Sequence, residues 1–227
     1  MQGTQFSLLQ NVLKRLEDRE LLDHMVIIGS WCIYLYKEYF KNKNFTTTIR
    51  TRDVDLLILI PVRIGRKVDF FEIIEDLGFI RVFKGDEGYT TFQHPDLIIE
   101  FLIEERGKGN FKPVIIKELG VIPQAERYLN ILTSNIIKLN FNGISVPVPH
   151  PANFALHKIL ISPRRRKKFK ADMDKEQSIK LLHDLIQNGD INEIKSSFNK
   201  MPKPWQETIK KELKGLNEDE ILRLIES

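Results

Sequence analysis

Two aspartates spaced two residues apart open an apolar stretch of the sequence. Asp53 and Asp55 begin the segment 53–60, whose other residues are valine, leucine and isoleucine, as in a strand buried on both faces. Successive side chains of a strand alternate between its faces, so both carboxylates are expected to point the same way. Two close carboxylates repel each other unless a cation lies between them. Such an incomplete set of oxygen ligands favours Mg²⁺, which usually also binds the phosphates of a substrate.

A third carboxylate stands in a similar setting. Glu100 interrupts the apolar segment 97–103, and burying an unpaired charge there would be expensive. If its strand lies beside the strand of Asp53, three carboxylates converge. Three carboxylates can hold two metal ions and support an in-line displacement at phosphorus.

Gly29 and Ser30 supply a complementary feature. They follow a short apolar run, residues 25–28, and precede a helix predicted to extend to about residue 40. A glycine in such a strand-to-helix turn allows close approach of another group to the backbone. The amide groups that begin the helix favour an anion such as a triphosphate, and the Ser30 hydroxyl adds a donor or caps the helix.

In this order, the Gly-Ser turn, the Asp53-Val54-Asp55 pair and Glu100 between apolar residues resemble the signature of the polymerase-β-type nucleotidyltransferase superfamily. The resemblance covers residues 22–104, with weaker support to residue 185. The segment Val146-Pro147-Val148-Pro149-His150-Pro151, followed by Phe154-Ala155-Leu156-His157-Lys158, is similar to the start of the helical half in some small bacterial nucleotidyltransferase-like proteins, including some near toxin–antitoxin nucleotidyltransferases. Thr51-Arg52 before the acid pair also fits such proteins.

The resemblance implies an α/β (α+β) fold with a small mixed sheet and a helical C-terminal domain. It implies a metal-dependent enzyme that moves a nucleoside monophosphate from an NTP such as ATP to an acceptor hydroxyl, with release of pyrophosphate. Two Mg²⁺ or Mn²⁺ ions would be held by Asp53, Asp55 and Glu100, and Glu100 would also act as base. The residues implied to contact the nucleotide are Gly29, Ser30, Arg52 and Lys158. The acceptor could be tRNA, a protein or a small molecule.

Composition changes near residue 149. Residues 136–141 and 144–148 flank Asn142-Gly143, which predicts a β-hairpin with a type I′ turn. Upstream, the patterns predict helices at 6–21 and 68–77 and strands at 79–83, 89–92 and 97–103. Downstream, the spacing of apolar residues predicts helices over 152–162, 174–187, 191–198, 204–213 and 218–226. We therefore predict a nucleotidyltransferase-like α/β domain at 1–149 and a helical domain at 150–227.

A run of cations lies within this second part. Arg164, Arg165, Arg166, Lys167 and Lys168 are followed by Lys170. The run is either a solvated loop between helices or a clamp for a triphosphate or a nucleic-acid backbone, since arginine forks match phosphate oxygens.

Length and composition narrow the class of protein. The 227 residues suit one sizeable domain or two small ones, and 35 basic against 31 acidic residues give a net charge of +4. A single cysteine, Cys32, excludes an internal disulfide framework and a cysteine-rich zinc site. We find no signal-peptide pattern and no apolar run near the ~20 residues that span a bilayer. From these features we expect a cytoplasmic protein that does not associate with a membrane.

Other interpretations remain open at this stage. The aspartates could cap a strand end beside Arg50 and Arg52, and Glu100 could pair with Lys112 or Lys117 on a surface strand. The chain could also be a non-catalytic nucleotide-binding or regulatory, antitoxin-like module, or an RNA-binding protein that uses the cation run. The intact set of three acids favours the enzyme.

Overall fold

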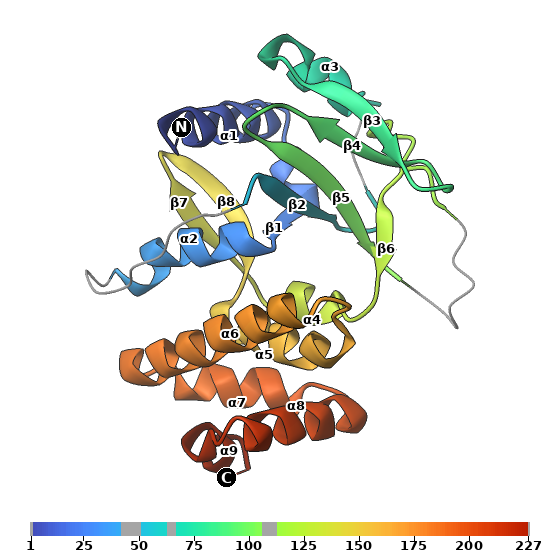
Figure 1. The fold of residues 1–227 in the computed structure, drawn as a ribbon. Coiled ribbons are helices and arrows are strands. Elements are labelled where there is room, and N and C mark those ends of the chain that lie inside the picture. Colours follow the sequence, from blue (N-terminus) through green and yellow to red (C-terminus); the bar gives the residue numbers. More distant parts are fainter. Residues whose placement is uncertain (1, 42–50, 63–66, 106–112, 227) are drawn as a thin grey trace. The chain divides into compact units, whose positions relative to one another are not determined.

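The computed structural model describes residues 2–41, 51–62, 67–105 and 113–226 (Figure 1). Contacts between residues divide the chain into two compact units. The first comprises Met1–Leu129 and Ile136–Val148, and the second comprises Asn130–Asn135 and Pro149–Ser227.

The first unit is built on a mixed sheet. Its strands are β1 (Met25–Ile28), β2 (Asp53–Ile58), β3 (Ile80–Lys84), β4 (Tyr89–Gln93), β5 (Ile98–Glu104) and β6 (Gln124–Glu126). They lie in the order β1-β2-β5-β4-β3, with β6 paired to β5. β5 is parallel to β2 and β6, whereas the other pairs are antiparallel. The predicted mixed sheet is therefore confirmed.

The two faces of this sheet differ in burial. Along β5, Ile99, Phe101 and Ile103 are buried, while the residues between them are half-buried. The buried face packs under α3 (Phe70–Ile74), where the Phe70 ring lies edge-on to the Phe101 ring at 4.8 Å between centroids. Because side chains alternate along a strand, Glu100 lies on the opposite, more open face.

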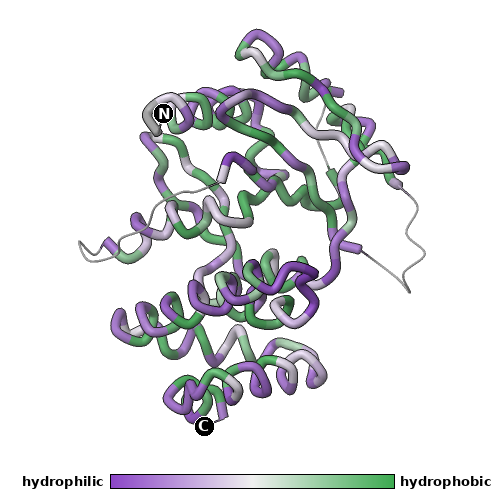
Figure 2. Tube along the Cα trace, viewed as in Figure 1, coloured by the Kyte–Doolittle hydropathy of each residue, from purple (hydrophilic) through white to green (hydrophobic). Residues whose placement is uncertain are grey.

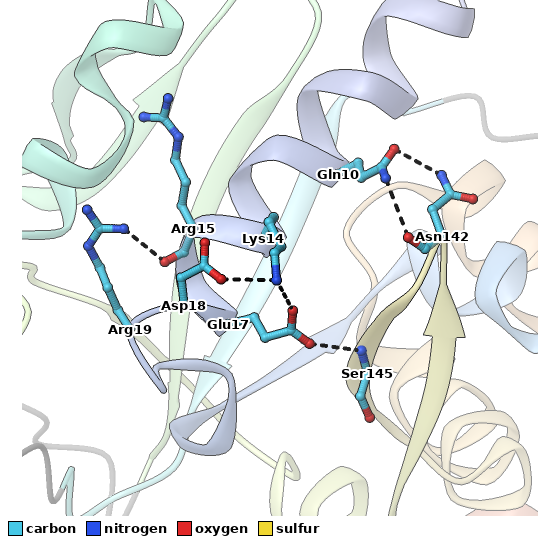
Figure 3. Close-up of polar contacts among 8 residues, drawn as sticks. All are labelled: Gln10, Lys14, Arg15, Glu17, Asp18, Arg19, Asn142 and Ser145. Carbon is cyan, nitrogen blue, oxygen red and sulfur yellow. Dashed lines mark hydrogen bonds and ion pairs between the residues drawn. The ribbon is translucent and has the colours of Figure 1, made fainter.

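The other elements of the first unit surround the sheet. They are α1 (Gln2–Glu17), η1 (Leu22–His24), α2 (Ser30–Phe40), η2 (Glu75–Leu77) and the hairpin of β7 (Ile136–Phe141) and β8 (Ile144–Pro149). Figure 3 shows how α1 is joined to this hairpin: the Gln10 and Asn142 side chains are hydrogen-bonded, and a Glu17 carboxylate oxygen accepts from the Ser145 amide. Asn142 and Gly143 have φ of 51° and 89°, as the predicted type I′ turn requires.

The second unit is helical. It contains α4 (Asn130–Thr133), α5 (Pro151–Ile161), η3 (Ser162–Arg164), α6 (Lys168–Asn188), α7 (Ile191–Asn199), α8 (Lys203–Gly215) and α9 (Asp219–Glu226). Helix α5 is buried over most of its length and contacts α4, α6, α7 and α8. The outer helices alternate hydrophilic and hydrophobic residues along the chain (Figure 2), so each buries one face against α5 or its neighbours.

The structure differs from the predicted elements in four places. Helix α1 spans Gln2–Glu17 rather than residues 6–21. Helix α6 begins at Lys168 rather than at residue 174, so part of the cation run is helical. Helix α3 begins only at Phe70, because the Asp69 side chain accepts from the Phe71 amide and caps it there. The short elements β6 and α4 have no periodic pattern that predicts them. Within the described ranges, no helix is both long and apolar enough to cross a membrane.

Candidate active site

The three predicted carboxylates lie on the open face of two adjacent strands. In the parallel pairing of β2 with β5, Asp55 is the register partner of Glu100, and Asp53 is the partner of Ile98. Residues at equivalent positions of neighbouring strands share a face, so all three carboxylates belong to one side of the sheet. Asp53 is exposed, and Asp55 and Glu100 are half-buried. The expectation that the strand of Glu100 lies beside that of the aspartates is confirmed.

Gly29 lies directly against Asp55. Ile28 is the register partner of Asp55 on β1, so the turn that follows β1 passes over this carboxylate. Gly29 has φ +74°, and a Cβ built there would lie 3.1 Å from Asp55 Cγ and closer still to Oδ2. Both the backbone conformation and the space therefore require glycine.

Helix α2 begins at this turn with Ser30. Its N-cap residue, Gly29, has no side chain that could cap the helix, and the first turn contains no acidic residue. The Ser30 side chain is exposed. The beginning of α2 thus presents backbone amides and the positive end of the helix dipole near Asp55, an arrangement that favours an anion.

The Asp53 carboxylate has a neutral partner and the Glu100 carboxylate has a cationic one. An Asp53 carboxylate oxygen accepts from the Thr51 hydroxyl at 3.1 Å, and the Asp53 amide donates to the same hydroxyl oxygen at 3.0 Å. A Glu100 carboxylate oxygen accepts from Lys84 Nζ at 2.6 Å. Lys84 and Glu100 are each partly exposed, so solvent screens this ion pair.

The donor set suits a hard divalent cation, because it offers only carboxylate oxygens on one face. In the part of the chain that the structure describes, however, no three His, Cys, Asp or Glu side chains are gathered to hold a metal. The Lys84 ion pair accounts for the position of Glu100. To share a cation with Asp55, its register partner, Glu100 would have to leave Lys84 by a side-chain rotation.

Arg52 and the alternative ion-pair partners can also be located. Arg52 is exposed, and its guanidinium donates to the Pro95 carbonyl at 2.7 Å rather than to the aspartates. Arg50 and Lys112 lie outside the described residues. The ion-pair partner found for Glu100 is Lys84, not Lys117. A role for Arg52 in nucleotide binding stays a prediction.

Lys158 belongs to the second unit, where it forms part of a buried ion cluster. Its Nζ lies 2.9 Å from Asp174 Oδ1, and Arg165 Nε lies 2.8 Å from Asp174 Oδ2. The Lys158 and Asp174 side chains are each 11% exposed. His157, beside Lys158 in α5, is buried, and neither of its ring nitrogens has a hydrogen-bond partner among the described residues. Burial, with the nearby cations Lys158 and Arg165, lowers the pKa of His157 to about 3.

The cation run lies in the same unit, from the end of η3 through the connecting residues to the beginning of α6. Its members are all exposed: Arg164, Arg165, Arg166, Lys167 and Lys168. The positions of Lys158 and of the cation run do not test whether either contacts a phosphate. Both contacts stay predictions.

Sequence reasoning missed Lys84. Val82, Thr91 and Glu100 form one row across β3, β4 and β5, and Lys84 stands two residues beyond Val82 on the same face. The predicted strands at 79–83 and 89–92 already indicate an antiparallel pair. What no local signal provides is the position of that pair beside the strand of Glu100.

Comparison with known proteins gives a family and several similar folds. A family model described as "Nucleotidyltransferase" matches residues 7–201. A search of curated protein sequences gives no match. Among solved structures, the chain is similar to the antibiotic-resistance factor ANT(2'')-Ia in solution, with 15% identity, a TM-score of 0.47 and coverage of 83% of this chain and 90% of that chain.

Two further solved structures are similar to the chain. The first is ANT(2'')-Ia in complex with adenylyl-2''-tobramycin, with 14% identity, a TM-score of 0.49 and coverage of 82% and 96%. The second is an antigenic nucleotidyltransferase-like protein from Paracoccidioides brasiliensis, with 19% identity, a TM-score of 0.41 and coverage of 77% and 76%. The family model spans far more than half of the sequence, and the chain therefore belongs to this nucleotidyltransferase family.

Proposed function

We propose that this nucleotidyltransferase moves a nucleoside monophosphate from an NTP, such as ATP, to an acceptor hydroxyl and releases pyrophosphate. The observation that carries the proposal is the pairing of Asp55 with Glu100 across β2 and β5, with Asp53 on the same face. The turn at Gly29, which brings the beginning of α2 against Asp55, supports it. We also propose that the two units correspond to a catalytic α/β domain and a helical domain.

In this proposal Asp53, Asp55 and Glu100 hold two Mg²⁺ or Mn²⁺ ions. When bound, the ions neutralise phosphate charge and lower the pKa of the acceptor hydroxyl. The acceptor oxygen forms a bond to the α-phosphorus while the bond from that phosphorus to the β-phosphate oxygen breaks, and pyrophosphate leaves. Glu100 accepts the hydroxyl proton, for which it must first separate from Lys84.

Four residues are proposed to contact the nucleotide. Gly29 and Ser30 hold phosphate oxygens through the amides that begin α2, and Arg52 adds a cation beside Asp53. Lys158 reaches a phosphate only if it exchanges Asp174 for that anion, because the two are now paired at 2.9 Å. The acceptor is a tRNA, a protein side chain or a small molecule, each of which would give a labelled product of a different size.

The test is transfer of label from each NTP, radiolabelled in the α-phosphate, in the presence of Mg²⁺ or Mn²⁺. Purified protein is incubated alone and with a total cell extract. Wild type is compared with Asp53→Asn/Asp55→Asn. Glu104→Gln is the matched control, because Glu104 is half-buried on the same strand and face as Glu100. Circular dichroism verifies that each variant is folded.

The expected result is a labelled product with wild type and Glu104→Gln, and none with the double aspartate variant. Equal labelling by the double variant would overturn the proposed role of the carboxylates. Nucleotide binding by folded wild type without transfer under any condition would instead favour a non-catalytic, regulatory module.

A further inference from the structure

A dense set of cations surrounds two exposed apolar side chains where α6 begins. We call these residues the α6 basic surface: Arg166, Lys167, Lys168, Phe169, Lys170 and Met173. All are exposed. The two arginines before them are engaged elsewhere, since Arg164 donates to the Leu160 carbonyl and Arg165 pairs with Asp174. Within the described part of the chain, the four cations of the surface form no ion pair.

These cations stand where a helix disfavours them. Lys167 is the N-cap of α6, Lys168 begins it, and Lys170 follows in the first turn, which contains no acidic residue. The positive end of the helix dipole repels cations at these positions. The next turn has two acids: Asp174 is already paired with Lys158 and Arg165, and Asp172 forms no ion pair with any described residue. A local arrangement that opposes helix stability without internal compensation is typical of functional positions.

Phe169 and Met173 point away from the body of the second unit. They are 60% and 41% exposed, and four residues of separation place them on one side of the helix. The opposite side of α6, which includes Ala171 and Leu182, is buried. The phenyl ring therefore stands in solvent between Lys168 and Lys170.

Unneutralised cations around an exposed aromatic ring match a polyanion whose charges alternate with flat apolar groups. Single-stranded nucleic acid has this chemistry, because its phosphates take cations and its unpaired bases stack on aromatic rings. A membrane surface fits less well, since only two apolar residues are exposed here. We propose that the α6 basic surface binds single-stranded RNA, with Phe169 as the stacking platform.

This inference is independent of the proposed transfer reaction, and its test measures binding alone. The probe is a fluorescein-labelled oligouridylate of about 12 nucleotides, a length within the range of known single-strand sites. Fluorescence anisotropy is measured with the full chain at several salt concentrations. Lys167→Gln/Lys168→Gln/Lys170→Gln removes three cations of the surface. The control, Lys200→Gln/Lys203→Gln/Lys211→Gln, removes three other exposed cations of the same unit and changes the net charge equally.

The α6 triple variant is expected to bind at least ~10-fold more weakly and to lose about 2 from the slope of log affinity against log salt, since each phosphate contact contributes about 0.7. The control triple variant should bind as wild type does. Phe169→Ser should weaken binding roughly 5- to 100-fold, as loss of one base-stacking contact does. Thermal unfolding establishes that each variant is folded, which is expected because the substituted side chains are exposed.

Three results would overturn the proposal. The first is equal weakening by both triple variants, which would reflect net charge alone. The second is evidence against base stacking: either Phe169→Ser has no effect on binding, or duplex RNA binds as tightly as the single strand, although duplex bases cannot stack on a protein ring. The third is binding to phosphatidylserine vesicles without binding to the oligonucleotide, which would make the surface a membrane contact.

Discussion

Replacing Gly29 by alanine tests the geometry at the centre of the candidate active site. Two independent costs are expected. Gly29 has φ 74° and ψ −156°, a region adopted essentially by glycine alone, and an L-residue there costs about 1–3 kcal/mol. The new Cβ would also meet the Asp55 carboxylate, at 3.1 Å from Cγ and closer to Oδ2, and such overpacking costs roughly 1–3 kcal/mol. Gly29→Ala should therefore reduce the free energy of unfolding by roughly 2–6 kcal/mol.

Gly88→Ala separates these two costs. Gly88 has φ +71°, and a Cβ there would meet nothing within 4 Å. This control therefore carries only the backbone penalty, which is about 1–2 kcal/mol for a left-handed alanine. Urea denaturation followed by circular dichroism measures both. As a second comparison, Gly29→Ala is made in an Asp55→Ala background, where the clashing atoms are gone and only the backbone penalty should remain.

The same substitution should also reduce activity. If the methyl group introduced by Gly29→Ala displaces the Asp55 carboxylate by about 1 Å, the loss in transfer rate should be on the order of 100-fold, whereas Gly88→Ala should leave the rate unchanged. The reasoning is refuted if Gly29→Ala costs no more than Gly88→Ala, or if its cost is the same with and without the Asp55 side chain. Either result would mean that the turn does not lie against the carboxylate.

Three further predictions follow from the buried and paired charges. Lys84→Met should tighten Mn²⁺ binding roughly 1.5- to 5-fold by releasing Glu100 from an exposed pair worth about 0.2–1 kcal/mol; unchanged affinity in a paramagnetic-resonance titration would mean that Glu100 is not a ligand. His157 has its pKa lowered from 6.5 to about 3 in the folded chain, so the unfolded chain binds the proton first and stability falls as the pH falls below about 6.5. At pH ~5 this loss is about 2 kcal/mol, and urea midpoints of His157→Phe should lack it; an identical acid loss in the variant would exclude this histidine as the cause. Asp174→Asn should destabilise by roughly 3–5 kcal/mol, because it leaves Lys158 buried without its anion. Lys158→Met should cost less, since Asp174 keeps its second cation, and the reverse order in urea denaturation would contradict this account of the cluster.

Local signals predicted the parts of the fold that short-range sterics determine. The alternation of side chains placed Asp53 and Asp55 on one face, and the strand positions agree with the structure to within two residues. The Asn142-Gly143 turn was predictable because both residues must adopt positive φ, which few other pairs tolerate. The Gly29-Ser30 turn was likewise recognisable from a strand that ends at a glycine and leads into a helix.

Contacts between segments that are distant in the sequence could not be predicted from the sequence. The position of Glu100 beside Asp55 could be stated only as a condition, because strand order is set by the packing of the whole sheet. The Lys84 ion pair depends on the order of three strands and had no signal at all. The sequence indicated that Lys158 could bind a phosphate, but in the structure it pairs with Asp174 on α6. Which faces of two helices pack together cannot be predicted from the sequence of either helix alone.

The start of α6 shows a different limit. The beginning of a helix disfavours cations, because the positive end of the helix dipole lies there. The dense cations around Phe169 therefore predicted a loop. The helix nevertheless begins at Lys168, because its opposite side, from Ala171 onward, is buried. Tertiary packing overrode the local preference at the same residues that form the proposed RNA-binding surface.

The short segment Asn130–Asn135 has a consequence for modularity. It belongs to the second unit, although the hairpin that follows it belongs to the first. Asn153 of α5 donates to the Ile131 carbonyl at 2.9 Å and to the Ser134 hydroxyl at 2.8 Å. The polypeptide therefore passes between the units three times, and a cut after residue 149 separates α4 from the helix that binds it. The sequence of the helical unit is interleaved with that of the first unit. A single recombination or a single protease cleavage therefore cannot add or remove the complete helical unit.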